Sequence, residues 1–176
     1  MGQYYMPLIK RDDTVDVYAN FVNGEYIMAK LMEHSWYNNP FVNAIAKMIY
    51  KAPAQIAWVG DYADDDDPKI YDMAYSEGVE HRKDLTYDGE FDLDNKYLLD
   101  HTKKLYVDCS EYKDKAKDEW IIHPLSLLTA VGNGLGGGDY RGGKCKDKVG
   151  SWRMDLISIE DEPPMSYAKL NVFFEE

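Results

Sequence analysis

Apolar and polar positions alternate along much of the chain in the two-residue period that is typical of β-strands. Residues 3–9 (QYYMPLI) and 14–22 (TVDVYANFV) are rich in β-branched and aromatic residues and flank the polar stretch KRDD, which predicts an opening hairpin. Residues 54–60 (AQIAWVG) form a short apolar run that predicts a buried strand. The run 24–36 fits both the strand and the helix period, and we expect a strand there.

Two segments predict helices instead. The first begins at Pro40 with Asn39 as its N-cap, and its apolar face is formed by Phe41, Ala44, Ile45, Met48 and Ile49. The second begins at Pro68 with Asp67 as its N-cap and Gly78 as its stop. Three-to-four spacing of the apolar residues gives each helix one buried face, with which it is expected to pack on a sheet.

The C-terminal half repeats the strand pattern. Residues 96–112 contain two apolar stretches around a polar middle, which predicts a hairpin, and residues 111–120 are polar and suit a short helix. The run 120–131 (WIIHPLSLLTAV) is apolar enough to be internal, although Pro124 limits its pairing as a central strand. Residues 151–162 and 167–174 predict two further strands, and 79–95 an irregular connection. We therefore expect one α+β domain over residues 1–176, with a mainly antiparallel sheet and two or three helices packed on it.

Composition narrows the functional classes. The chain has 176 residues, of which 45% are hydrophobic and 30% charged, and its formal net charge is −12. An excess of negative charge opposes binding to phosphate backbones. We expect a soluble cytoplasmic protein with no membrane segment, because no apolar stretch approaches the roughly 20 residues that a spanning helix needs and the first residues lack a signal peptide's pattern. Two cysteines, Cys109 and Cys145, suit a reducing compartment.

The negative charge is concentrated in residues 61–100, which hold fourteen acidic and four basic residues. A solvated loop, a Mg²⁺ or Ca²⁺ site and a docking surface for a basic protein all fit such a segment. A calcium loop that starts at Asp88 is excluded because Leu93 and Leu99 stand where glycine and glutamate are required. The docking hypothesis places the contacts on the DYADDDD stretch, at Asp61, Tyr62, Asp64, Asp65, Asp66 and Asp67.

A glycine-rich segment lies between residues 132 and 143, where seven of the thirteen glycines occur. It contains GxGxxG and GxxxxGK patterns, but no amphipathic helix follows, and Cys145 replaces the Ser or Thr of a P-loop. Two interpretations stay open. The segment is either a bulged turn that another backbone segment passes closely or a site for a small anion or nucleotide formed by Gly134, Gly136, Gly137, Gly138, Arg141 and Lys144.

The remaining chemistry gives no positive signal for an enzyme. None of the four histidines or two cysteines has the short spacing of a zinc motif. His34 and His101 each adjoin a carboxylate and a hydroxyl residue, which permits acid–base chemistry, although a structural role is more common for a single histidine. The GxSxG and HExxH motifs do not occur. We expect a non-enzymatic protein with no metal or cofactor, and the alternative is a small-molecule or nucleotide-binding protein or an enzyme centred on the glycine-rich segment, with His101 or His123 near it.

Several strings together resemble one group of small proteins from bacteria, their phages and other mobile elements, a group without an agreed function. These strings are MGQYY, EHSW, AWVGDYAD, HTKKLYVD, HPLSLLTAVGNGLGGGDYRG, VGSW and EDEPP. The group offers no catalytic residues to carry over. The resemblance implies an origin in a phage, a prophage or a gut-type bacterium, where small acidic proteins block host defence complexes such as CRISPR–Cas nucleases. We therefore expect a counter-defence factor of the CRISPR–Cas inhibitor type, whose negative surface docks on a basic nucleic-acid-binding groove without contacting nucleic acid directly.

Overall fold

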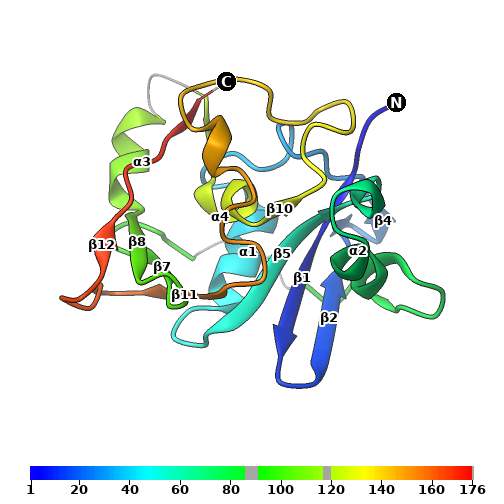
Figure 1. Cartoon of the computed structure of the whole chain (residues 1–176), viewed down its shortest axis with the longest axis horizontal. Helices are drawn as coiled ribbons and strands as arrows, with labels where there is room; N and C mark the ends of the chain where they lie inside the picture. The colour runs from blue at the N-terminus through cyan, green and yellow to red at the C-terminus, as the bar shows by residue number, and fades with distance from the viewer. Residues whose placement is uncertain (86–90, 117–119, 176) are drawn as a thin grey trace.

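A mixed, mainly antiparallel sheet of nine strands organises the computed structural model, which describes residues 1–85, 91–116 and 120–175. The fold is α+β, as the sequence predicts. Eight strands follow the order β12-β8-β7-β11-β5-β1-β2-β6, and β10 pairs with β5 beside this path (Figure 1). Their bounds are β1 Tyr5–Arg11, β2 Thr14–Tyr18, β5 Ala54–Gly60, β6 His81–Arg82, β7 Tyr97–Asp100, β8 Leu105–Asp108, β10 Ala130–Val131, β11 Leu156–Glu160 and β12 Ala168–Lys169.

Strand β5 lies at the centre of this sheet. It pairs antiparallel with β1 along most of its length, while its other edge pairs with β11 at one end and β10 at the other. Alternate residues point to opposite faces, as the strand geometry requires. Ile56 and Trp58 enter the larger hydrophobic cluster, whereas Ala57 and Val59 enter the smaller one. Because both faces are covered, β5 reads as a continuous apolar run in the sequence.

Helices cover both faces of the sheet. The larger cluster joins one face to buried residues of α1 (Pro40–Met48), α3 (Ser110–Lys115) and α4 (Pro124–Leu128). The smaller cluster joins the other face to Ile70 and Ala74 of α2 (Pro68–Tyr75) and to Ala63 of the short 3-10 helix η1 (Ala63–Asp65). In Figure 1, α2 lies in front of β1 and β2, while α1 lies behind β5. The acidic stretch therefore belongs to the helical cover of the smaller cluster.

Most of the predicted elements are confirmed. The β1–β2 and β7–β8 hairpins form in the expected segments, and both predicted N-caps accept backbone N–H groups, Asn39 at α1 and Asp67 at α2. The β7–β8 turn needs no glycine because Lys104 adopts a positive φ of 56° and the buried Asp100 carboxylate accepts two turn amides. The shorter elements are β3 Phe21–Val22, β4 Glu25–Tyr26, β9 Ile121–Ile122, β13 Phe174–Glu175 and the 3-10 helix η2 Lys146–Lys148.

The expected strand over residues 24–36 is wrong beyond Tyr26. Strand β4 covers only Glu25–Tyr26, and the chain then runs irregularly across the end of β1 and the glycine-rich segment. Its backbone groups bond to those neighbours: the Tyr5 N–H donates to the Ala29 carbonyl at 2.8 Å, and the Met32 N–H donates to the Gly138 carbonyl at 3.0 Å. Tertiary contacts thus replace the strand ladder that the local pattern favoured.

The apolar run 120–131 is internal, as predicted, but it divides into three short elements. Strand β9 is followed by α4 and then by β10. His123 is fully buried and is the N-cap of α4, where its Nδ1 accepts the Leu125 N–H at 3.0 Å. Pro124 occupies the first position of this helix, where it loses no hydrogen bond.

In the part of the chain that the structure describes, no helix combines the length and apolar character required to cross a bilayer.

His123 makes the stability of the fold sensitive to acid. Burial lowers the pKa of this imidazole to about 3, whereas in an unfolded chain it is about 6.5. Between these two pKa values His123 is protonated in the unfolded state and neutral in the folded state. The free energy of unfolding therefore falls as the pH drops from about 6.5 towards about 3. The variant His123→Asn keeps a side-chain oxygen for the cap but cannot titrate.

We expect this variant to reduce the pH dependence of the unfolding free energy by up to about 1.4 kcal/mol per pH unit within that window. Urea unfolding at a neutral and an acidic pH measures it. An unchanged pH dependence would show that His123 is not held neutral in the fold.

Candidate functional site

The acidic stretch begins where the central strand β5 ends, and part of it builds the local fold. Asp67 precedes α2, and its Oδ1 accepts the backbone N–H groups of Lys69 at 3.2 Å and Ile70 at 3.1 Å. This cap satisfies donors that the first turn of a helix leaves unpaired. Pro68 takes the first helical position. The Asp67 carboxylate therefore has a structural role as the N-cap of α2.

Two further carboxylates of the stretch attach it to distant segments. Asp61 Oδ1 accepts the Tyr4 N–H at 3.0 Å, and burial raises the pKa of this carboxyl group. Asp66 Oδ2 accepts both the Gly132 N–H at 2.9 Å and the Arg153 guanidinium at 2.6 Å. Together with Asp67, these contacts fix η1 and α2 against the sheet and the glycine-rich segment.

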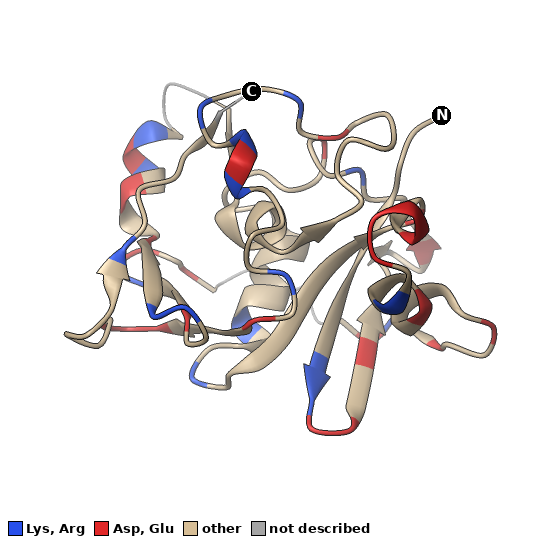
Figure 2. Ribbon diagram, viewed as in Figure 1, with Lys and Arg blue, Asp and Glu red and all other residues tan. Residues whose placement is uncertain are grey.

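Other carboxylates in residues 61–80 are exposed and make no ion pair with any described residue. We define the acidic surface as these five side chains, which lie on η1, on α2 and in the turn that follows: Asp64, Asp65, Asp72, Glu77 and Glu80. Lys69 is the single basic residue in this segment. In Figure 2 the acidic colour is concentrated along the side of the molecule that carries η1 and α2.

The wider segment 61–100 does not form one face. Strand β6 lies at one edge of the sheet, and β7 is separated from it by β11, β5, β1 and β2. Asp84 pairs with Arg82, Asp94 pairs with Lys113, and Asp100 is buried. Asp88 and Glu90 lie outside the described residues. The candidate docking surface is therefore limited to residues 61–80.

Of the six residues that the sequence proposes for docking, Asp64 and Asp65 are exposed and unpaired among the described residues. Tyr62 precedes η1 and is partly buried. Asp61 and Asp67 are partly buried and Asp66 is exposed, and all three accept the hydrogen bonds given above. Asp72, Glu77 and Glu80 join the surface although the DYADDDD string does not include them, and their signal in the sequence is the continued excess of acidic residues up to residue 80.

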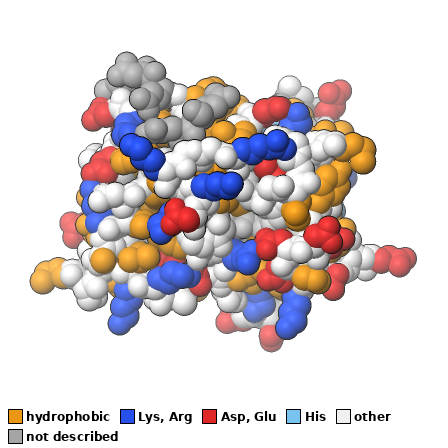
Figure 3. All heavy atoms as spheres, turned by 45° about the horizontal axis from the view of Figure 1, so that its top comes forward, with side chains coloured by type: hydrophobic (Ala, Val, Ile, Leu, Met, Phe, Trp, Pro, Cys, Tyr) orange, Lys and Arg blue, Asp and Glu red, His pale blue; other side chains and the backbone are white. Residues whose placement is uncertain are grey.

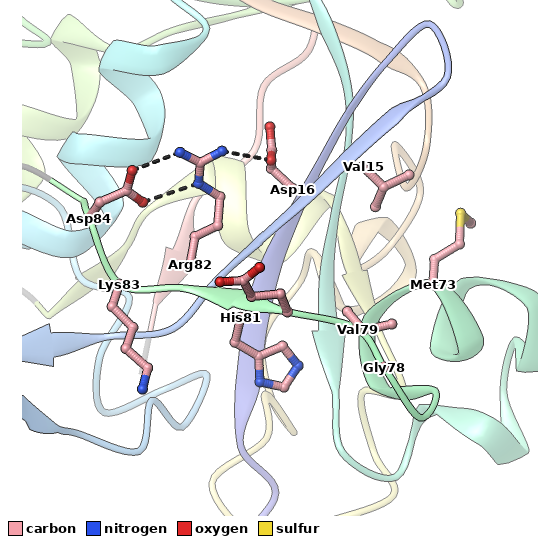
Figure 4. A pocket seen from close by; sticks show the side chains of 10 residues that line it. Val15, Asp16, Met73, Gly78, Val79, His81, Arg82, Lys83 and Asp84 are labelled. Carbon is pink, nitrogen blue, oxygen red and sulfur yellow. Dashed lines mark hydrogen bonds and ion pairs between the residues drawn. The ribbon is translucent and has the colours of Figure 1, made fainter.

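An open hollow of about 1040 Å³ lies beside α2, at the edge where β6 pairs with β2 (Figure 4). Val15, Met73 and Val79 form its apolar part. At the other end, the Arg82 guanidinium lies between two carboxylates, with Nη1 donating to Asp16 at 3.0 Å and Nη2 to Asp84 at 2.7 Å. Glu80 also lines the hollow. The acidic surface thus adjoins a concave region with an apolar part and with charged residues of both signs, because Arg82 and Lys83 line it too.

The glycine-rich segment folds around the N-terminal residues of the chain. The Gln3 N–H donates to the Gly137 carbonyl at 2.9 Å, and the Gly137 N–H donates to the Met1 carbonyl at 2.9 Å. A Cβ atom at Gly136 would lie 2.3 Å from the Gln3 Cβ, which no side chain could tolerate. This geometry matches the interpretation in which another backbone segment passes closely.

The Asp139 carboxylate accepts the backbone N–H groups that a bound anion would need. Asp139 is 5% exposed, and its Oδ2 accepts the N–H groups of Gly134 at 2.8 Å and Gly136 at 2.9 Å. Its Oδ1 accepts the Tyr5 hydroxyl at 2.8 Å. Burial and the nearby Asp139 raise the pKa of Tyr5 well above its ordinary value, so the hydroxyl keeps the proton that it donates.

Arg141 and Lys144, the two cations assigned to that anion site, are exposed. Arg141 donates to the Gly136 carbonyl at 3.4 Å. With Lys146, Lys148 and Arg153 they make residues 141–153 basic, against the single acid Asp147. Figure 3 shows Lys and Arg side chains over the middle of the face turned toward the viewer. This basic segment adjoins the acidic stretch, since Arg153 pairs with Asp66 and both line a pocket with Asp65 and Lys146.

The histidines have structural partners. His101 lies in a chain of polar contacts in which Nδ1 lies 2.8 Å from the Tyr167 hydroxyl and Nε2 lies 2.8 Å from the Ser158 Oγ, which itself donates to Glu160. Ser158 is fully buried in β11, so no substrate reaches its hydroxyl. Within the described ranges, no three His, Cys, Asp or Glu side chains converge in a way that could hold a metal ion.

Comparisons with protein-family models, with curated proteins and with solved structures give no match. The resemblance of the sequence strings therefore stays a prediction, and the function is argued from the chain's own geometry.

The contacts of Asp139 predict a large effect of removing its carboxylate. In Asp139→Ala, the Gly134 and Gly136 amides and the Tyr5 hydroxyl lose their acceptor, and of these residues Gly136 and Tyr5 are buried. Since each unpaired buried donor costs about 1 kcal/mol or more, we expect a loss of about 2 kcal/mol of unfolding free energy.

Chemical denaturation measures this loss. The control is Asp147→Ala in the same segment, where an exposed carboxylate pairs only with the neighbouring Lys148, and where we expect less than about 0.5 kcal/mol. Equal effects of the two variants would contradict the structural role given to Asp139.

Proposed function

We propose that the protein is a non-enzymatic docking protein whose acidic surface binds a basic groove on a protein partner that handles nucleic acid. The observation that carries the proposal is the acidic surface itself: five exposed carboxylates without an intramolecular ion pair among the described residues, on elements that three other aspartates hold in place. Carboxylates at spaced, fixed positions can pair with the Arg and Lys side chains that otherwise bind phosphates.

The fixed position of these carboxylates favours association. A partner that binds a flexible acidic tail must order it, which costs free energy for every residue immobilised. Here the Asp67 cap and the Asp66 contacts to Gly132 and Arg153 already order η1 and α2. The charges are therefore presented without that ordering cost.

The hollow beside α2 offers contacts for a Lys or Arg side chain of the partner. Val15, Met73 and Val79 offer apolar area for the methylene stem of Lys or Arg, and Glu80 offers a carboxylate for its charged end. Long basic side chains bury their stems against apolar surface while the charge stays near water or a counter-ion. The apolar part and Glu80 thus favour a projecting basic residue in the hollow, whereas Arg82 and Lys83 in the same lining oppose one.

The uneven distribution of charge would orient the encounter. A cationic groove attracts the acidic surface and repels the basic residues 141–153, of which Lys146 and Arg153 lie beside Asp65 and Asp66. Association should therefore be oriented and should weaken as the salt concentration rises, because exposed charges are screened.

The narrower form of the proposal is a counter-defence role, in which the partner is a CRISPR–Cas effector and docking excludes its target DNA. What supports this form is the charge pattern and the resemblance of the sequence strings. An anion or nucleotide site in the glycine-rich segment has less support, because Gly134, Gly136 and Gly137 donate their amides within the chain.

A DNA-binding competition tests the proposal. Guide-loaded CRISPR effector complexes of several types are mixed with labelled target DNA and titrated with the protein. We expect the native chain to lower DNA binding by at least one effector. We expect the triple variant Asp64→Asn, Asp65→Asn, Asp72→Asn to inhibit about tenfold less, since each neutralised contact contributes a fraction of a kcal/mol to about 1 kcal/mol.

A matched control removes the same number of charges elsewhere. Asp12, Asp13 and Glu162 are exposed and lie outside the acidic surface, so Asp12→Asn, Asp13→Asn, Glu162→Gln should inhibit like the native chain. If the Asp64, Asp65, Asp72 variant inhibits as strongly as the native chain, the docking surface is wrong. If the native chain leaves every effector's DNA binding unchanged, the counter-defence form is wrong.

A further inference from the structure

A second pocket, apart from the acidic surface, has a different chemistry. It has a volume of about 520 Å³ and lies between the connection around β3, the residue after β4 and the N-terminal turn of α1. Its lining includes Phe21, Asn23, Ile27, His34, Trp36 and Asn39. Small-molecule pockets have volumes of about 300–1,000 Å³ and combine apolar walls with a few polar groups.

The lining carries no formal charge from acidic or basic residues. None of the nine described residues around the pocket is Asp, Glu, Lys or Arg, in a chain of which 30% is charged. A buried ionic ligand would have no counter-ion in this pocket, and leaving water without one is costly. The pocket therefore suits a neutral ligand.

Asn39 supplies a hydrogen-bond donor. Its side-chain oxygen accepts the Phe41 N–H at 2.9 Å and the Val42 N–H at 3.2 Å, so the cap fixes the orientation of the amide. The residue is 5% exposed, and its Nδ2 donates to no residue in the described part of the chain. The residue lines the pocket, so this unpartnered N–H can donate to the oxygen of a ligand that enters the pocket.

His34 supplies a second donor. Its Nδ1 accepts the Lys30 N–H at 3.1 Å. In the neutral ring the proton then lies on Nε2, and within the described ranges this N–H has no partner. Two donors from different segments, the turn after residue 30 and the start of α1, thus line the same neutral pocket.

Aromatic rings complete the walls. Phe21 and Trp36 line the pocket with Phe41 of α1. Trp36 packs against Trp120 with ring centroids 5.4 Å apart, and Phe21 packs against Tyr26 at 5.6 Å. Trp120 and Tyr26 remain 45% and 47% exposed. Large aromatic area with polar groups beside it is typical of recognition sites.

We propose that this pocket binds a neutral sugar, as a monosaccharide or a terminal sugar of a larger glycan. The C–H face of a pyranose ring fits against an aromatic side chain, its hydroxyl or acetamide oxygens accept from Asn39 Nδ2 and His34 Nε2, and the absence of lining charges selects against sugar acids and sugar phosphates. Such a ligand carries oxygen acceptors for both of these donors.

Tryptophan fluorescence can follow binding. Trp58 and Trp152 are each 1% exposed, so a change on ligand addition reports Trp36 and Trp120. We expect methyl glucoside or N-acetylglucosamine to give a saturable change. In Asn39→Asp the affinity should fall at least tenfold, because the carboxylate keeps the helix cap but replaces the donor by an acceptor.

The neighbouring Asn38→Asp is the matched control, since Asn38 is exposed and outside the pocket lining, and it should bind within twofold of the native chain. If Asn39→Asp lowers the melting temperature, Asn39→Ser replaces it, because serine also caps a helix and lacks the amide.

The proposal is overturned if neither sugar gives a saturable change up to about 50 mM, which means a binding free energy weaker than about 2 kcal/mol. It is also overturned if both Asn39 variants bind like the native chain, or if glucuronate or an apolar peptide binds as well as the neutral sugars.

Discussion

The rest of the structure depends on one repeated interaction, in which an aspartate carboxylate accepts backbone N–H groups. Such bonds are charge-assisted and therefore stronger than bonds between neutral groups. They cap α2, close the β7–β8 turn, connect the acidic stretch to β1 and to the glycine-rich segment, and order that segment from within. The aspartates that act in this way are Asp61, Asp66, Asp67, Asp92, Asp100, Asp108 and Asp139.

This interaction changes the meaning of the acidic composition. A net charge of −12 suggests a molecule covered in carboxylates, yet these seven aspartates bind backbone amides, and two of them, Asp100 and Asp139, are buried. The carboxylates that remain free in residues 61–80 therefore stand out against a surface that also carries a basic segment at residues 141–153. A local field of this kind, more than the net charge, decides which partner is attracted and in which orientation.

Local signals in the sequence were sufficient for much of the fold. The hairpins, the buried strand β5 and the helices α1 and α2 follow from periodicity and from caps whose partners are two or three residues away. The strand expected over 24–36 failed because its backbone partners, Tyr5 and Gly138, lie far along the chain. Short-range pattern cannot report such bonds.

The residues of the candidate sites were also predictable only where local pattern reports them, because contacts between residues that are distant in the sequence leave no such pattern. The acidic stretch is visible as a run of letters, but which of its members face solvent depends on Tyr4, Gly132 and Arg153. The glycine density indicated a close passage of backbone, whereas the role of Asp139 required the N-terminal residues to be placed beside it. The pocket around Asn39 was missed because a cap signal identifies the bonded oxygen and does not indicate what the other end of the amide faces.

Neighbouring carboxylates of one acidic run divide into structural and unpaired groups. Chemical denaturation of Asp67→Ala and Asp64→Ala tests this division by comparing their unfolding free energies. We expect a loss of about 1 kcal/mol for Asp67→Ala, the usual cost of removing an N-cap, and a change within about 0.5 kcal/mol for Asp64→Ala, as for an exposed residue. Equal changes in the two variants would contradict the division.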